Sequence, residues 1–157
     1  MSAPARLVRC GLARFLRCRK GGAGVEFAII APVLILATVG TVDLGLGLYQ
    51  NMQVQNAAQA GAVYAASHPF SASNIATVVG SATKSSGVTA SPAPAQFCGC
   101  ASATGVASNA CNTSCPAGGT AGTYVSVNAS ASYSPMLPYP FLPSALTLSS
   151  QAIVRTN

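Results

Sequence analysis

The chain contains one apolar run that is long enough to cross a lipid bilayer. Residues 27–42 read FAIIAPVLILATVGTV without a charge, and the apolar character resumes after Asp43 and continues to Tyr49. A helix over residues 25–49 rises about 37 Å, whereas the hydrocarbon core of a bilayer is about 30 Å thick. The run therefore predicts a retained membrane-spanning helix. A cleaved secretory signal fits less well, because its apolar core usually has only about 7–15 residues.

Positive charge is concentrated before this run. The net charge of +6 equals the contribution of six residues: Arg6, Arg9, Arg14, Arg17, Arg19 and Lys20. Beyond Gly21, Lys84 and Arg155 balance the two acidic residues of the chain. A basic segment beside an apolar run orients a membrane helix with its basic end in the cytoplasm. This distribution argues against nucleic-acid binding and places residues 50–157 outside the cytoplasm.

Both acidic residues lie in or beside the apolar run, Glu26 at its start and Asp43 seventeen residues later. Ionisable groups are costly in a membrane and by default indicate a function. With Glu26 near the inner edge of the bilayer, Asp43 falls near the outer edge. Asp43 either binds a basic or polar group of a partner or marks the water boundary. The simpler alternative for Glu26 is a carboxylate that reaches the lipid head groups.

The helix is expected to continue to about residue 66. Small apolar residues recur there at spacings of three and four and form one face: Val54, Ala57, Ala58, Gly61 and Ala65. Such a face allows close approach of another element, which is either the chain's own outer domain or another subunit. His68-Pro69 ends the helix, because a residue before proline disfavours the α conformation.

Residues 67–157 are expected to fold as a small α+β domain. Its first element is a short helix that Ser71 or Ser73 caps and that continues to about Ser85, with Gly87 after it. The domain has few charges and no Trp, so its core is thin and covalent staples are expected.

Strand patterns follow this helix. In residues 124–133, apolar side chains at the odd positions from Val125 to Tyr133 alternate with polar ones, which predicts a strand. Residues 145–155 form a second strand with a less regular alternation. Residues 88–97 add an edge strand that Pro92 and Pro94 interrupt. The expected sheet is antiparallel with about three strands.

Four cysteines lie in the loop of residues 98–115: Cys98, Cys100, Cys111 and Cys115. Outside the cytoplasm they predict two disulfides. Three pairings are possible, and a Cys98–Cys100 bridge is sterically disfavoured, which favours cross-loop bridges. A four-cysteine zinc site is the alternative, but its C-x-C spacing is irregular and an oxidising compartment removes the thiolates.

A proline-rich connection, residues 134–143, joins the two main strands. Its apolar side chains form a candidate contact loop: Met136, Leu137, Tyr139 and Phe141. His68 is the only histidine, and no carboxylate accompanies it outside the membrane segment, so the sequence offers no pair of nucleophile and base. The sequence predicts a protein that is not an enzyme and has no cofactor, metal or small-molecule substrate.

Four blocks, in order, resemble the TadE-like pseudopilins, which are minor pilin-like subunits of the bacterial tight-adherence (Flp pilus) machinery. The blocks are residues 22–28 (GAGVEFA), 31–34 (APVL), 43–45 (DLG) and 55–65 (QNAAQAGAVYA). The resemblance is strong over about residues 20–66, and the two terminal strand patterns also resemble the family's ending.

The resemblance implies a single-pass inner-membrane protein with a cytoplasmic leader (residues 1–21), a long helix (residues 22–66) and a periplasmic domain (residues 67–157). It implies that a prepilin peptidase cuts between Gly21 and Gly22. Glu26 of one subunit would then pair with the new α-ammonium of Gly22 on a neighbour, where opposite charges attract more strongly than in water. The expected partners are the membrane, other pilin-like subunits, pilus assembly proteins and the peptidase.

Two other functions remain compatible with the sequence. A membrane-anchored periplasmic binding module that does not polymerise would use the cysteine loop and the proline-rich connection as its ligand surface. A small redox protein would use Cys98 and Cys100, although the usual C-x-x-C spacing is missing.

Overall fold

The structure is a computed structural model that describes residues 22–85, 87–140 and 143–156. The chain divides into two compact units, of which the first ends at Val42 and the second begins at Asp43. The basic leader with Gly21 lies outside the described residues, and so does Phe141 of the candidate contact loop.

The described part of the first unit is the beginning of helix α2 (Gly22–Ser67). Its large apolar side chains from Val25 to Val42 are exposed, except for half-buried Val39, and an 18-residue stretch of the helix has a mean hydropathy of 2.2. The hydroxyls of Thr38 and Thr41 each donate to a carbonyl one turn earlier at 2.8 Å, so neither brings an unpaired donor into this apolar surface. By length and composition, α2 suits a single membrane span.

In the second unit, one side of α2 faces the domain. Its buried and half-buried residues follow one another at spacings of three and four: Asp43, Gly47, Gln50, Val54, Ala57, Gly61 and Ala65. From Val54 onward, these residues contribute to the domain core. The small-residue face recognised in the sequence therefore packs on the chain's own domain.

The short helix α3 (Ala72–Ser81) ends earlier than the expected Ser85. The Ser71 side chain caps it by accepting a hydrogen bond from the backbone N–H of Asn74 at 3.5 Å. Ile75 and Val79 point inward and are fully buried. The helix therefore covers the core through one apolar side.

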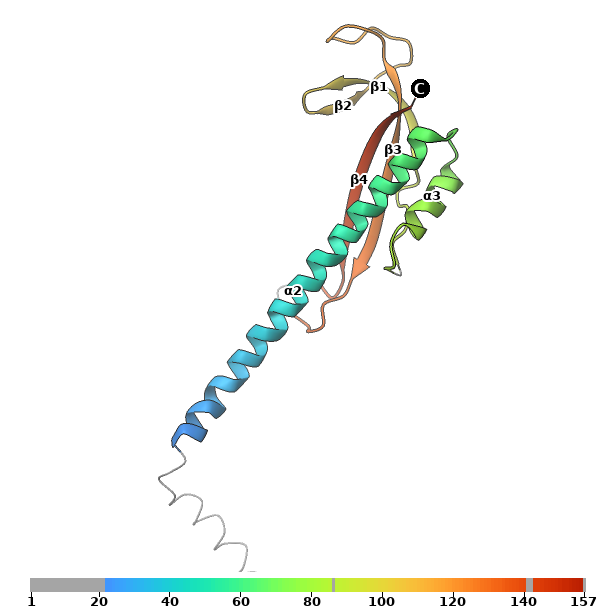
Figure 1. Ribbon diagram of the computed structural model, residues 1–157. Coiled ribbons are helices and arrows are strands. Elements are labelled where there is room, and N and C mark those ends of the chain that lie inside the picture. Colours follow the sequence, from blue (N-terminus) through green and yellow to red (C-terminus); the bar gives the residue numbers. More distant parts are fainter. Residues whose placement is uncertain (1–21, 86, 141–142, 157) are drawn as a thin grey trace, which may run out of the picture. The chain divides into compact units, whose positions relative to one another are not determined.

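The sheet has four antiparallel strands in the order β2-β1-β3-β4 (Figure 1). Its long central pair is β3 (Gly122–Tyr133) with β4 (Leu146–Thr156), in register from Thr123 opposite Thr156 to Tyr133 opposite Leu146. The shorter strands β1 (Ala95–Ser102) and β2 (Gly105–Ser108) form a hairpin on the other side of β3. This arrangement confirms the α+β class.

The edge of the sheet differs from the expectation. In place of a strand over residues 88–97, Thr89 forms an isolated bridge with Ser130, and β1 begins at Ala95. Pro92 and Pro94 lack the amide hydrogens that a continuous ladder requires. Strand β2 is a fourth strand that the alternation pattern did not indicate, because it has four residues and lies within the cysteine loop.

The core lies between the two helices and one face of the sheet. Strand β3 contributes Val125, Val127, Ala129 and Ala131 from alternate positions, and β4 adds half-buried Leu148, Ala152 and Val154. The opposite face of β3 carries Ser126, Asn128 and Ser130, which are partly exposed. A single layer of apolar contacts thus holds the domain together.

Gly61 of α2 makes the closest approach to this core. A Cβ added there would lie 2.6 Å from Cγ2 of Val79 and 2.8 Å from Cγ1 of Val127. Both valines are fully buried and β-branched, so neither can turn aside freely. We expect Gly61→Ala to lower the free energy of unfolding by up to about 2 kcal/mol, because overpacking costs about 1–3 kcal/mol and helix propensity returns about 1 kcal/mol.

Chemical denaturation of the full chain in detergent measures this loss. Gly80→Ala in α3 is the matched control, because the nearest atom to an added Cβ there is the Val88 carbonyl oxygen at 3.8 Å. The control is expected to be as stable as the wild type or more stable. A Gly61→Ala variant that is more stable than the wild type would show that the helix is not in close contact with the sheet.

Candidate functional site

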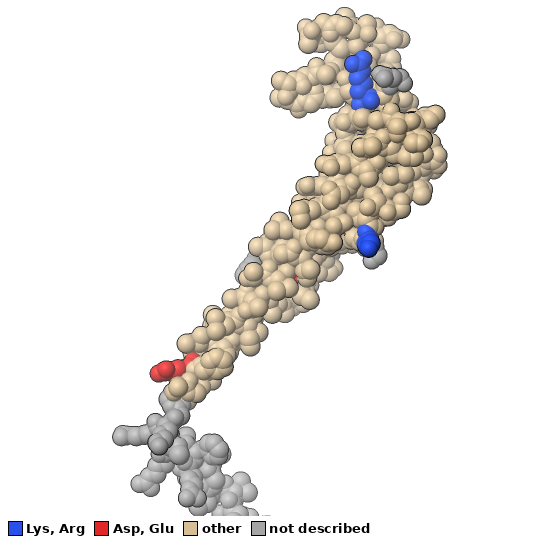
Figure 2. Space-filling model, in the orientation of Figure 1, with Lys and Arg blue, Asp and Glu red and all other residues tan. Residues whose placement is uncertain are grey.

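The two carboxylates of α2 have different surroundings. Glu26, in the first unit, is exposed among exposed apolar side chains. Asp43, in the second unit, is 4% exposed. Figure 2 shows that charged side chains are sparse on this face of the molecule, so the position of each carboxylate is informative about function.

The Asp43 carboxylate is bound by the end of β3 and by the connection that follows it. The Tyr133 hydroxyl donates to one carboxylate oxygen, and the backbone N–H of Met136 lies 3.2 Å from each of the two oxygens. The Tyr133 hydroxyl also lies 2.8 Å from the backbone carbonyl oxygen of Asp43. These donors replace water around a carboxylate that the fold buries.

Successive turns of α2 position the groups that bind Asp43. Gly47 lies one turn further along, and a Cβ added there would be 3.4 Å from the Tyr133 ring. Gln50 lies on the next turn and donates from its side chain to the Ser132 carbonyl at 3.3 Å. The helix thus fixes the end of β3 and the start of the proline-rich connection.

The same contact changes the acid–base behaviour of two tyrosines. The hydrogen bond with Asp43, together with burial, raises the pKa of Tyr133 to about 12. Burial, followed by the neighbouring Asp43, raises the pKa of Tyr139. Both hydroxyls therefore stay protonated at neutral pH, and Tyr133 remains a donor to the carboxylate.

Some side chains of the proline-rich connection are exposed, and others are half-buried. Met136 is 66% exposed, as expected, whereas Leu137 and Tyr139 are half-buried rather than exposed. A cavity of about 250 Å³ lies within the connection, lined by residues 135–139, 143 and 144. The contact surface of the described connection is therefore narrower than the sequence suggested.

Two disulfides join the β1–β2 hairpin to the segment that follows it. Cys98 is bonded to Cys111, and Cys100 is bonded to Cys115, so both bridges cross the loop. Each cysteine of the C-x-C pair thus has a partner outside the pair. With this pairing, the four sulfurs are not thiolates that bind zinc, and Cys98 and Cys100 do not form a redox couple with each other.

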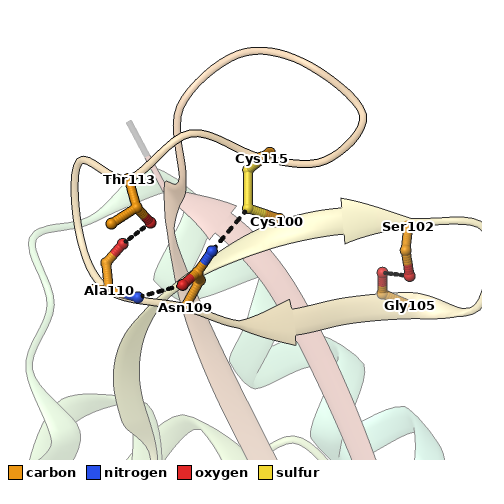
Figure 3. The surroundings of a disulfide bond; sticks show 7 residues. All are labelled: Cys100, Ser102, Gly105, Asn109, Ala110, Thr113 and Cys115. Carbon is orange, nitrogen blue, oxygen red and sulfur yellow. Dashed lines mark hydrogen bonds between the residues drawn. A yellow bond between two sulfur atoms is a disulfide. The ribbon is translucent and has the colours of Figure 1, made fainter.

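Polar and steric contacts surround the second bridge (Figure 3). The side-chain amide of Asn109 lies 3.7 Å from the Cys100 sulfur, and its oxygen accepts from the Ala110 N–H at 2.9 Å. Between the two cysteines of β1, Gly99 has no space for a side chain, because a Cβ would lie 2.7 Å from the Ala107 carbonyl oxygen. The Asn109 contact and the close packing at Gly99 both lie beside the bridge, which joins the hairpin to the segment that follows it.

Sequence reasoning identified Asp43 but missed its partners. Asp43, Gly47 and Gln50 extend the small-residue series of α2 toward the N-terminus at the same spacings. That continuation was the available signal that Asp43 faces the domain. The identity of Tyr133 as its donor had no local signal, since the two residues are 90 positions apart.

Removal of the Tyr133 hydroxyl tests this contact. We expect Tyr133→Phe to lower the free energy of unfolding by about 1–3 kcal/mol, because a buried carboxylate loses a donor. The pKa of Tyr133 in the folded chain is about 12, and an unfolded tyrosine titrates near 10. The hydrogen bond therefore contributes fully below about pH 10, and its contribution is lost as the pH rises toward about 12.

Denaturation midpoints measured between neutral pH and pH 12 check this expectation. The wild type should lose stability across the alkaline window, and Tyr133→Phe should lose less. Tyr49→Phe removes an exposed hydroxyl of α2 and serves as the control. Identical alkaline profiles for wild type and Tyr133→Phe would contradict the hydrogen bond.

A comparison with protein-family models matches residues 21–63, a little over a quarter of the chain, to the family described as TadE-like protein. The match includes both carboxylates and most of α2. No curated protein and no solved structure matches the chain. The family match supports a pilin-like protein associated with the tight-adherence pilus. Over residues 21–63 the chain is similar to TadE-like proteins, which confirms the resemblance found in its sequence.

Proposed function

We propose that this chain is a membrane-anchored, pilin-like subunit or assembly factor of a bacterial tight-adherence pilus machine. The observation that carries the proposal is the exposed, uncharged helix segment between Glu26 and Asp43, which lies within the residues that match the TadE-like family. An exposed apolar surface of this kind indicates a membrane or an assembly partner. The role is structural, and no step of chemistry is assigned to the chain.

The disulfides support a periplasmic location for the domain. Such bonds persist in oxidising compartments and are rare in the cytoplasm. Both bridges lie in the second unit, beyond the apolar segment. The basic leader before that segment favours the same orientation. In this proposal, the domain stands outside the inner membrane, and the leader lies in the cytoplasm.

Assembly is proposed to depend on Glu26. A prepilin peptidase would cut between Gly21 and Gly22 and create an α-ammonium at Gly22, which is the first residue of α2. Glu26 lies about one helical turn further along, and its side chain is exposed. It is therefore accessible to the α-ammonium of a neighbouring subunit, and a charge pair in a poorly hydrated site fixes register as well as proximity.

The N-terminus of the protein purified from native membranes tests the processing step. Mass spectrometry is expected to find a chain that begins at Gly22. A functional protein that still carries Met1 would contradict the proposed amine and, with it, the charge pair.

Two variants of Glu26 test the assembly step. Glu26→Gln should insert and be processed, but its co-purification with other pilin-like subunits should fall by about tenfold or more, the change that corresponds to about 1.4 kcal/mol. Glu26→Asp keeps the charge and should retain more of the interaction. Equal recovery of partners with Glu26→Gln and the wild type would remove Glu26 from assembly.

The second candidate is a membrane-anchored binding module that does not polymerise. Two structural observations favour it: the small-residue face of α2 packs on its own domain, and the donors that bind Asp43 belong to the same chain. Both groups are therefore engaged without a second subunit. Under this alternative, the Glu26 variants would leave the protein's interactions unchanged.

A further inference from the structure

The outward side of α2 remains apolar for some distance after Asp43. Leu44, Leu48, Tyr49 and Met52 are all exposed. The next exposed residues on this side are polar, namely Gln55, Asn56 and Gln59, and Val63 is a single exposed apolar residue beyond them. The change from apolar to polar therefore occurs after Met52, nine residues beyond the carboxylate. On a helix that leaves a membrane, such a change marks the boundary between lipid and water.

The helix length agrees with a boundary near Met52. From Glu26 to Met52 a helix rises about 39 Å, and a bilayer with its head-group regions is about 40–45 Å thick. Asp43 then lies on the membrane side of the boundary, where a carboxylate without partners is costly.

The domain supplies what a carboxylate at this depth requires. Tyr133 and the Met136 N–H bind Asp43, so its oxygens do not depend on water. The proline-rich connection around Asp43 is compatible with lipid. Residues 85–154 contain no charged side chain, and the prolines of the connection have no N–H that would need a hydrogen-bond partner. Met136, whose own N–H binds the carboxylate, has an exposed apolar side chain.

We propose that residues 135–140 are a lipid-contacting cover that seals Asp43 in the outer leaflet of the membrane and places the Met136 side chain among the lipids. This inference rests on the proposed membrane anchoring of α2. Lipid is favoured over a second copy of the chain because the apolar side of α2 is continuous with the segment proposed to cross the membrane. The cover is thus a second membrane contact, made by the domain rather than by the helix.

Tryptophan fluorescence tests the cover directly, because the chain contains no Trp. Each variant carries one tryptophan in the full chain, reconstituted in phosphatidylcholine vesicles with spin-labelled lipids as quenchers. Leu34→Trp reports on the membrane segment, Met136→Trp on the cover, and Leu48→Trp on the outward side of α2. Ile153→Trp is the control, since Ile153 is exposed on β4, seven residues or about 23 Å of strand beyond Leu146.

We expect lipids labelled deep in their chains to quench Leu34→Trp, and lipids labelled near the head group to quench Met136→Trp and Leu48→Trp. Ile153→Trp should keep its fluorescence. If Leu34→Trp is quenched and Met136→Trp behaves like Ile153→Trp, the cover does not contact lipid, although the anchoring stands. If Leu34→Trp is not quenched, the anchoring fails and the cover fails with it. A blue shift of Met136→Trp that grows with protein density, without lipid quenching, would identify a second copy as the occupant and overturn the proposal.

Discussion

The hydrogen bonds to Asp43 are the constraint on which the arrangement of the domain depends. They join the N-terminal end of its helix segment to the end of β3, across 90 positions of sequence. A buried carboxylate that loses its donors is expensive, so the contact resists separation of helix and strand more than an apolar contact of similar size. The proline-rich connection, which begins at the same place, takes its position from this contact.

Helix α2 has one side that faces its own domain and another side that faces outward, and the two sides carry different residues. Its domain-facing side uses glycine and alanine, which allow the sheet to approach closely, as at Gly61. Its outward side is apolar up to Met52 and then mainly polar, with Val63 as an exposed apolar exception. The proposed membrane anchor needs both properties, since such a helix must be stable in lipid and still carry a folded domain. The small residues therefore belong to the fold of one chain and do not require a partner.

Elements with a periodic pattern were predictable from the sequence. The long helix, a short helix capped by Ser71 or Ser73, and the β3–β4 pair all follow from apolar spacing or from a capping residue, and the structure identifies Ser71 as the cap. Strand β2 was not predictable, because four residues are too few to carry a pattern. The donors of Asp43 were not predictable either, since only the folded sheet brings Tyr133 and Met136 to the helix. The sequence predicts that Asp43 lies at the membrane edge, but its place in the apolar run does not predict burial of Asp43 by the domain.

Hydrogen exchange at the Met136 amide is the most direct test of the contact at Asp43. In the full chain in lipid nanodiscs, this amide should exchange slowly in the wild type and rapidly in Asp43→Ala, while the Val127 amide of β3 stays slow in both. The comparison between the wild type and Asp43→Ala distinguishes protection of the amide by the carboxylate from protection by lipid that excludes water. A Met136 amide that exchanges at the unprotected rate in the wild type, or equally slowly in Asp43→Ala, would contradict the central role of this carboxylate.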